Sequence, residues 1–393
     1  MKLRLGVIFG GESVEHEVSI ISAVQAMKKI DEEKYEIIPI YIGKDREWYT
    51  GKLLKDIDIY RDLDLLKKYA KNVVLTNKGD KFVLIKKTGI KRIIDYVDIV
   101  LPIVHGTNVE DGTLQGYLEL IGIPYAGSNV YSASIGQDKV FQKQILESNN
   151  LPVTKYTWFF DHDYREDEDS VLKKIKEVGY PVMVKPARLG SSVGISKVKD
   201  EKEIKDAIEE AIKYDEKVLV ERVVENLKEV NCSVLGNYEH QEASEIEEVM
   251  GIDEFLSYRD KYLGNSKKMK GTKGMASTNR ILPARLDEEM TSEVKELSKE
   301  VFRVLNACGV IRIDYLIDTK TKKVYINETN TIPGSLSFYL WEATNKDYTK
   351  LLDEIISLAI RTYKRKKRKV YSFESNILSN FNGLKGSKGK LKM

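Results

Sequence analysis

Cysteine and histidine are scarce in this chain: its 393 residues include two cysteines, Cys232 and Cys308, and four histidines. Neither cysteine stands at a metal-ligand spacing, so we expect two buried thiols in a reducing compartment rather than disulfides or a zinc site. No apolar run approaches the roughly 20 residues of a membrane helix. Residues 3–9 run directly into glycines and predict a buried strand rather than a signal peptide. We therefore expect a cytoplasmic protein without a membrane span.

Positive charge is in small excess overall, at +3, but it is concentrated at one end. Residues 361–393 hold eleven Lys or Arg against one acid, Glu374, a local balance of about +10. The rest of the chain therefore carries about −7, as is common in folded cytoplasmic proteins. We expect a basic, disordered tail. Nucleic-acid binding is not indicated, because the basic run has little aromatic interleaving.

Alternating strand and helix patterns predict three domains of the α/β and α+β classes. We divide the chain into an N-terminal α/β domain at 1–137, an α+β domain at 138–228, a third domain at 229–360 and the tail at 361–393. Strands are expected at 3–9, 35–42, 98–104, 310–317 and 323–329. The acidic stretch 161–169 is interpreted as a surface loop.

Two adjacent late strands carry the clearest candidate metal ligands. Side chains alternate faces along a strand, so Arg312 and Asp314 share one face, as do Glu328 and Asn330. A turn near Thr321 would pair Asp314 with Glu328 and Arg312 with Asn330 in antiparallel register. Such oxygen ligands suit Mg²⁺ bound between protein carboxylates and nucleotide phosphates. The alternative is a surface cluster of cross-strand salt bridges, and the hairpin alone does not separate the two.

Two glycine-rich segments can present backbone N–H groups to anions. Residues 185–194 lack the Gly-Lys-[Ser/Thr] ending of a Walker A loop and precede a strand, so they favour a hairpin covering phosphates, with Lys185 at the end of its strand. An ordinary flexible hairpin is the alternative. Residues 10–15 form a strand–helix turn in which Glu15 could hold a substrate ammonium or simply cap the helix. This turn is not the dinucleotide fingerprint, so NAD binding is not indicated.

An ordered set of motifs covers residues 3–335. It comprises Phe9-Gly-Gly-x-Ser-x-Glu-x-Glu-Val-Ser19, His105-Gly-x-x-x-Glu-Asp-Gly-Thr-Leu-Gln-Gly116, Gly122-Ile-Pro-Tyr-x-Gly-Ser128, Asp138-Lys139, Val184-Lys-Pro-x-x-x-Gly-Ser-Ser-Val-Gly194, Arg312-Ile-Asp314 and Asn327-Glu-x-Asn-Thr-x-Pro-Gly334. In order and spacing this set resembles the D-alanine–D-alanine ligase family of the ATP-grasp superfamily. The resemblance implies an ATP-grasp fold preceded by a Rossmann-like N-terminal domain.

The resemblance also implies a two-step ligation of D-alanine to D-alanine for peptidoglycan precursors. The first carboxylate attacks the γ-phosphate of ATP, and the amine of the second amino acid then displaces phosphate from the acyl phosphate. Catalysis of this kind depends on positioning and charge neutralisation. Two Mg²⁺ ions (or Mn²⁺), amino acids as small-molecule partners and a homodimer are implied as well.

Individual site residues follow from the same resemblance, position by position. ATP would be bound by Lys139, Lys185, Ser192, Glu221, Glu229 and Lys261, and the metal ions by Asp314, Glu328 and Asn330. Arg312 and the Gly334 N–H would stabilise the oxyanion of the tetrahedral intermediate. Glu15, ordered by Ser191 and Tyr262, would bind the first amino group, and His105 would line the same pocket. Tyr262, where relatives that favour D-lactate carry His, favours an amine acceptor.

One segment departs from the family pattern. After Gly334 the family usually continues with a Thr-x-x-Ser signature, whose serine binds the carboxylate of the second amino acid. Here Tyr339 stands at the position of that serine, and Ser337 or Tyr339 is left to supply the hydroxyl. A different acceptor (D-serine, glycine or another small amino acid) is therefore the closest alternative. A non-catalytic nucleotide-binding protein is the alternative from another class; loss of a metal ligand would be its natural signature.

Overall fold

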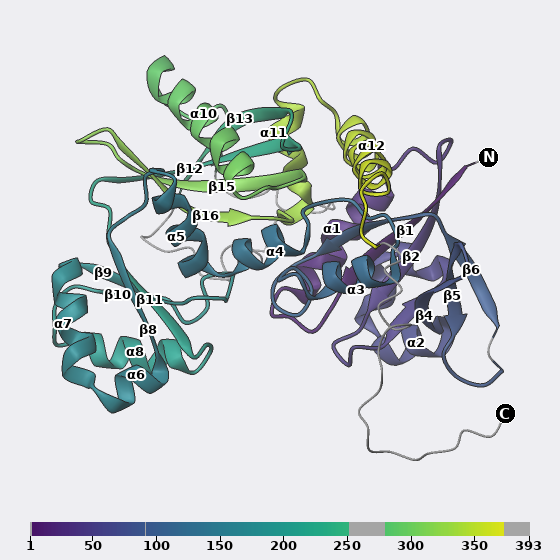
Figure 1. Cartoon of the computed structure of the whole chain (residues 1–393), viewed down its shortest axis with the longest axis horizontal. Coiled ribbons are helices and arrows are strands. Elements are labelled where there is room, and N and C mark those ends of the chain that lie inside the picture. The colour runs from purple at the N-terminus through teal and green to yellow at the C-terminus, as the bar shows by residue number, and fades with distance from the viewer. Residues whose placement is uncertain (1, 91, 251–279, 373–393) are drawn as a thin grey trace, which may run out of the picture.

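Three β-sheets organise the computed structural model, which describes residues 2–90, 92–250 and 280–372 (Figure 1). Within these residues no helix has both the length and the apolar character needed to cross a bilayer. Lys261, Tyr262 and the tail residues from 373 onward lie outside the described part.

The first domain is built on a seven-stranded sheet of order β6-β5-β4-β3-β2-β1-β7. Its strands are β1 (Leu3–Gly10), β2 (Tyr35–Ile42), β3 (Trp48–Thr50), β4 (Lys71–Lys78), β5 (Lys81–Lys86), β6 (Ile93–Val97) and β7 (Ile99–Val104). The three parallel strands β2, β1 and β7 are nearly continuous apolar runs because both faces are buried. Helices α1 (His16–Met27), α2 (Leu63–Tyr69) and α3 (Thr113–Ile121) and the short turns η1 (Lys52–Lys55) and η2 (Ile57–Arg61) complete this part.

The second unit is a four-stranded sheet of order β10-β9-β11-β8. Its elements are β8 (Tyr156–Phe160), α6 (Asp161–Glu166), α7 (Glu168–Val178), β9 (Val182–Pro186), β10 (Ser196–Val198), α8 (Ile204–Ile212) and β11 (Lys217–Arg222), and it follows α4 (Val130–Gln137) and α5 (Lys139–Ser148). The interpretation of 161–169 as a loop was wrong. Its acids cap helices instead: Asp163 accepts from the Phe160 N–H and Asp167 from the Ser170 N–H.

The third unit is a five-stranded antiparallel sheet of order β14-β13-β12-β15-β16. Its strands are β12 (Leu227–Gly236), β13 (Gln241–Val249), β14 (Arg280–Ile281), β15 (Gly309–Asp318) and β16 (Lys323–Asn330), and α10 (Glu288–Val304) packs on one face. The short η5 (Gly334–Ser337) and α11 (Phe338–Glu342) follow, and then the long α12 (Tyr348–Lys366).

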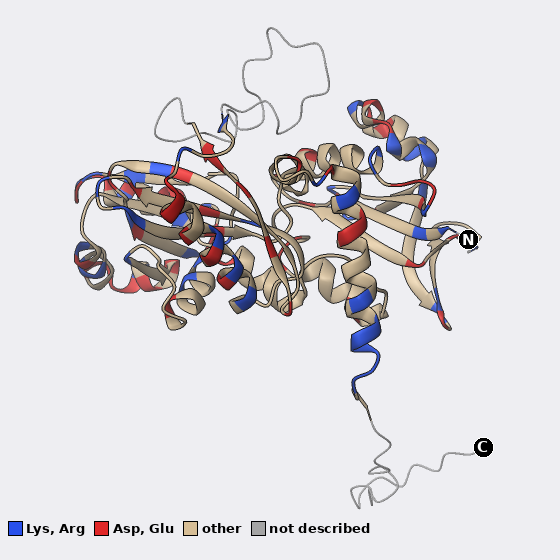
Figure 2. Ribbon diagram, turned by 90° about the horizontal axis from the view of Figure 1, so that it is seen from above, with Lys and Arg blue, Asp and Glu red and all other residues tan. Residues whose placement is uncertain are grey.

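Helix α12 lies beside the first sheet, although it comes last in the chain (Figure 1). Its apolar face, including Leu351, Leu352 and Ile355, belongs to the same buried core as β1, β2 and β7. The Tyr35 hydroxyl also donates to Asp353 at 2.6 Å. Since α12 continues to Lys366, the start of the basic stretch from 361 is helical, and Figure 2 shows its Lys and Arg where the helix leaves the body. The domain boundaries themselves remain a prediction.

Candidate active site

The late hairpin has the predicted register. Asp314 on β15 faces Glu328 on β16, and Arg312 faces Asn330, which confirms the pairing expected from strand alternation. The next strand, β12, places Asn231 opposite Asp314, and β13 places Glu247 opposite Asn231. A row of polar side chains therefore crosses four strands on one face of the sheet.

Hydrogen bonds tie the metal candidates to Arg312. Its Nε donates to Asp314 Oδ1 at 2.6 Å and a terminal nitrogen donates to Oδ2 at 2.8 Å; the amide of Asn330 donates to the same Oδ2 at 3.3 Å. Although burial opposes its charge, Asp314 raises the pKa of Arg312 well above its usual value. No cluster of three His, Cys, Asp or Glu among the described residues could hold a metal alone. Two carboxylates and an amide oxygen instead fit Mg²⁺ that takes its remaining ligands from phosphates and water.

A second charged group, from α5, β9 and β11, lies almost fully buried. The Glu221 carboxylate, 2% exposed, forms salt bridges with Lys185 and Lys143 (2.8 Å for Lys143) and accepts from the Thr154 hydroxyl at 2.9 Å. Burial disfavours its charge, yet the two lysines hold the pKa of Glu221 well below its usual range. Glu221 and Lys185, both predicted to bind ATP, are thus in direct contact. Glu229 acts electrostatically on the same Lys185.

Lys143 was missed by sequence reasoning. Burial lowers its pKa, while attraction to Glu221 opposes that shift. The available signal was its place four residues after Lys139, because two residues at this spacing share one face of a helix. Lys139 itself donates to the Leu189 carbonyl at 2.8 Å and lies 3.6 Å from Glu328, so it links the glycine-rich loop to the hairpin.

The glycine-rich loop meets the first domain at Glu15. The Ser191 hydroxyl donates to Glu15 Oε1 at 2.5 Å, so two members of the predicted group lie together. Ser191 and Ser192 both have φ of 58°, in the left-handed region. A Cβ at Gly190 would come within 2.9 Å of Glu15 Oε2, so a side chain at this position would displace the Glu15 carboxylate. The third member, Tyr262, and the predicted γ-phosphate ligand Lys261 lie outside the described residues.

Glu110 joins the first domain to the segment after the hairpin. Its carboxyl accepts from the Gly106 N–H at 3.0 Å and from the Ile332 N–H at 2.9 Å. Burial, and secondarily the charge of Glu15, raise the pKa of Glu110 to about 8. His105 is buried nearby, 3.2 Å from the Ser22 hydroxyl, and burial lowers its pKa to about 4, so its ring is neutral at pH 7. Glu110 belongs to the motif that runs from His105 to Gly116, but the sequence did not indicate a role for it.

The departing segment forms an unusual turn. Ser335, Leu336 and Ser337 have φ of 49°, 54° and 51°, three successive left-handed residues immediately after Gly334. The Ser335 N–H donates to the Ser22 hydroxyl at 2.9 Å, which fixes the turn against α1. The Ser337 hydroxyl is buried and has no hydrogen-bond partner in the described part of the chain. Tyr339, also buried, donates its hydroxyl to Glu247 Oε1 at 2.7 Å.

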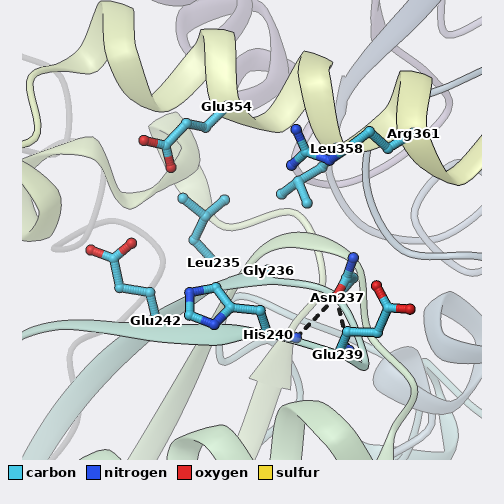
Figure 3. Close-up of a pocket in the computed structure, with 9 residues that line it drawn as sticks. All are labelled: Leu235, Gly236, Asn237, Glu239, His240, Glu242, Glu354, Leu358 and Arg361. Atoms are coloured by element: carbon cyan, nitrogen blue, oxygen red, sulfur yellow. Dashed lines mark hydrogen bonds between the residues drawn. The ribbon is translucent and has the colours of Figure 1, made fainter.

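A cavity of about 300 Å³ lies apart from these residues, between the β12–β13 turn and α12 (Figure 3). Its lining includes His240, Glu242, Glu354 and Arg361, and none of the predicted site residues. Lys346 neutralises part of its acidic side by pairing with Glu242 at 2.7 Å and with Glu354 at 2.6 Å.

Two family models match the chain. The one described as D-ala D-ala ligase N-terminus covers residues 4–128, and the one described as D-ala D-ala ligase C-terminus covers residues 145–357. Proteins named D-alanine--D-alanine ligase from Thermosipho melanesiensis and Caldicellulosiruptor bescii are each 41% identical to it. These alignments span 96% and 95% of this chain and 98% and 99% of the relatives.

Solved structures of similar chains have the same fold. A D-alanine-D-alanine ligase from Coxiella burnetii superposes with a TM-score of 0.77 at 29% identity, over 93% of this chain and 96% of the other. The VanG D-Ala:D-Ser ligase from Enterococcus faecalis gives 0.76 at 31% identity, over 91% of this chain and all of the other.

Proposed function

Because this chain belongs to the D-alanine–D-alanine ligase family, whose solved members share its ATP-grasp fold, we propose that it joins two molecules of D-alanine with ATP and Mg²⁺. The reaction would proceed through an acyl phosphate and supply a dipeptide for peptidoglycan precursors. Since ATP is an intracellular substrate, we place the reaction in the cytoplasm. A homodimer stays a prediction from the family resemblance.

The observation that carries this proposal is the convergence of the metal candidates, the lysines and the donor-side glutamate around one loop. Lys139 reaches from the loop carbonyl of Leu189 toward Glu328, and Ser191 of the same loop donates to Glu15. A loop in contact with both groups can hold a phosphate chain next to a substrate ammonium at Glu15. Such positioning is the main requirement for phosphoryl transfer to a carboxylate.

Each group has a defined part in this chemistry. A free carboxylate is a poor electrophile, and phosphorylation provides the leaving group that amine attack requires. When bound to Asp314, Glu328 and Asn330, Mg²⁺ would neutralise phosphate charge. Arg312, with the Gly334 N–H, would stabilise the oxyanion that forms as the amine attacks. Lys139, Lys185, Ser192 and Glu229, with Lys261, would bind ATP; Glu221, engaged by two lysines, would also hold Lys185 in place.

The test is phosphate release from ATP and Mg²⁺ with D-alanine, with the product identified by mass spectrometry. Strong release with D-alanyl-D-alanine as product supports the proposal, and Asp314→Asn should reduce it by at least about 100-fold by removing a carboxylate ligand. A matched control is Asp318→Asn at the other end of β15, where the carboxylate accepts from the Lys320 N–H; this variant should retain activity. Absence of release with D-alanine alone or with any second amino acid would reject the proposal.

D-serine as acceptor is the second candidate. It is favoured by the similarity to the VanG D-Ala:D-Ser ligase and by the altered segment around Tyr339. D-serine and glycine, each added together with D-alanine in the same assay, separate these acceptors by the mass of the dipeptide.

A further inference from the structure

Arg280, Glu247 and Tyr339 form a compact group that the proposed chemistry has not used. A terminal nitrogen of Arg280 donates to Glu247 Oε2 at 3.0 Å, and the guanidinium lies 4.0 Å from the centre of the Tyr339 ring. The other carboxylate oxygen, Oε1, accepts from the Tyr339 hydroxyl at 2.7 Å and from the Asn231 amide at 2.9 Å. Glu247 is 3% exposed, so its charge is fully enclosed by these donors.

This group lies on the same face of the sheet as the metal candidates. Arg280 faces Val249 across β13–β14, and Val249 shares a face with Glu247 because side chains alternate along a strand. Glu247 continues through Asn231 to Asp314 in the row across β13, β12 and β15. Arg280 is therefore at the end of the row that begins at the candidate magnesium and oxyanion residues. Arg312 and Arg280 both act electrostatically on Tyr339, so this group borders the candidate oxyanion residue.

A cation at that end can bind the carboxylate of the acceptor amino acid. Its amine attacks the acyl phosphate near Arg312, whereas its own carboxylate stays charged throughout and must be bound away from the reacting carbon. In the proposed chemistry Arg312 acts at the oxyanion and Lys185 at ATP, so neither is assigned to this carboxylate. Of the two hydroxyls considered for this task, that of Tyr339 donates to Glu247 and that of Ser337 is fully buried.

We propose that Arg280, oriented by Glu247 and Tyr339, binds the carboxylate of the acceptor amino acid, an inference that rests on the proposed ligase function. The planar guanidinium matches a carboxylate in a two-pronged geometry. Tyr339, at the position of the usual serine, thus supports a guanidinium rather than supplying a hydroxyl. The chemical class recognised is a small amino acid with a free α-carboxylate.

The experiment uses two acceptors of nearly the same size, one with this negative charge and one without it. D-Alanine and D-alaninamide compete for the acceptor position with D-alanine as donor, and mass spectrometry gives the ratio of dipeptide to dipeptide amide. D-Alaninamide cannot act as donor, because it has no carboxylate to phosphorylate. Comparing the product ratio between variants removes the contribution of the different intrinsic reactivities of the two amines.

Arg280→Met should lower the preference for D-alanine over the amide by about 10- to 100-fold, the effect of losing a charge-assisted hydrogen bond. Arg280→Lys keeps the charge but loses the two-pronged geometry, so a fall of several-fold is expected. Arg285→Met is the matched control. Arg285 Nε donates at 3.0 Å to Oε2 of Glu248, which follows Glu247 on β13 and therefore points to the opposite face of the sheet. The control should keep the wild-type ratio.

Equal losses of both products in Arg280→Met, with the ratio unchanged, would show a purely structural ion pair and overturn the inference. A wild-type enzyme that accepts the amide as readily as D-alanine would overturn it as well. If Arg280→Met forms neither product, the ratio in Arg280→Lys decides, and an unchanged ratio there rejects the role. Failure of the wild-type enzyme to form any dipeptide would instead reject the proposed ligase function, so the two failures are distinguishable.

Discussion

The two ends of the candidate site hold their charges in different ways. At the nucleotide end, Glu221 is enclosed by Lys143 and Lys185, which extend from the neighbouring elements α5 and β9. At the acceptor end, Glu247 is satisfied by Arg280, Asn231 and Tyr339, which come from β14, β12 and α11. The first group is carried by regular helix and strand, whereas the second depends on the irregular left-handed turn that precedes Tyr339.

This difference separates nucleotide binding, which is the same for every acceptor, from acceptor recognition, which can vary. Binding a phosphate chain requires fixed positive charge, and two lysines on one carboxylate supply it in a rigid frame. Recognising an acceptor requires shape, which a turn and a short edge strand can alter without disturbing the metal ligands. The comparison predicts that substitutions at the nucleotide end reduce both stability and ATP turnover. Substitutions at the acceptor end should mainly change the selectivity for the acceptor amino acid.

The largest effect is expected from Glu221→Gln, which leaves two buried lysines without their carboxylate. Removing one partner of a buried ion group costs about 3–5 kcal/mol, so the midpoint of urea unfolding should fall sharply. Glu209→Gln, which breaks an exposed pair with Arg165, should cost less than about 1 kcal/mol. A cost for Glu221→Gln as small as that of this control would remove the contrast between the two ends.

Glu110, which accepts from the N–H groups of Gly106 and Ile332, predicts a pH dependence of stability. Its pKa is raised to about 8 in the folded protein, so the native carboxyl keeps a proton that the unfolded chain releases above about pH 4.5. Stability contributed by this group is therefore full below pH 4.5 and is lost as pH rises toward 8, with a slope approaching about 1.4 kcal/mol per pH unit. Glu110→Gln should flatten the decline in urea unfolding between pH 5 and 8; an unchanged slope would exclude Glu110 as its source.

Tyr339→Phe sharpens the comparison at the acceptor end. It removes one donor to buried Glu247 but keeps the ring under Arg280, so a cost of about 1–3 kcal/mol is expected. The KM for the acceptor should rise, while the KM for ATP stays near the wild-type value. A parallel rise in both would mean that the two ends are not independent.

The smallest effect is expected from Ser337→Gly. This substitution should leave stability unchanged or raise it, whereas it should weaken acceptor binding if the hydroxyl contacts the acceptor. Ser337 has φ of 51° and a buried hydroxyl without a partner in the described structure, so glycine should be neutral or stabilise by about 0.5–1 kcal/mol. If the hydroxyl nevertheless binds the acceptor, as first predicted, the acceptor KM will rise despite the gain in thermal stability. An unchanged KM would leave Arg280 as the remaining candidate.

Sequence patterns predicted the parts of the site that depend on local periodicity. The pairing of Asp314 with Glu328 follows from strand alternation and one turn, and the contact of Ser191 with Glu15 was implied by the family motifs. Arg280 could not be found in this way, because it lies on a two-residue strand whose partners are set by the register of β13.

Helix boundaries and capping mark another limit of prediction from the sequence. Acids at 161–169 indicate solvent exposure equally well in a loop and in the first turn of a helix, so the presence of α6 could not be decided from composition. The three left-handed residues after Gly334 carry ordinary Ser and Leu side chains, and only tertiary contacts such as Ser335 with Ser22 hold them there.

The position of α12 bears on the order in which the chain acquires its structure during synthesis. Leu351, Leu352 and Ile355 complete a core whose other members include Leu5, Val7 and other residues of the first sheet. On the ribosome, the first domain must therefore wait for nearly the whole chain to emerge before its apolar surface is covered. Nascent chains that end before residue 348 should expose this surface and recruit chaperones, although all the strands of the first sheet have already been made.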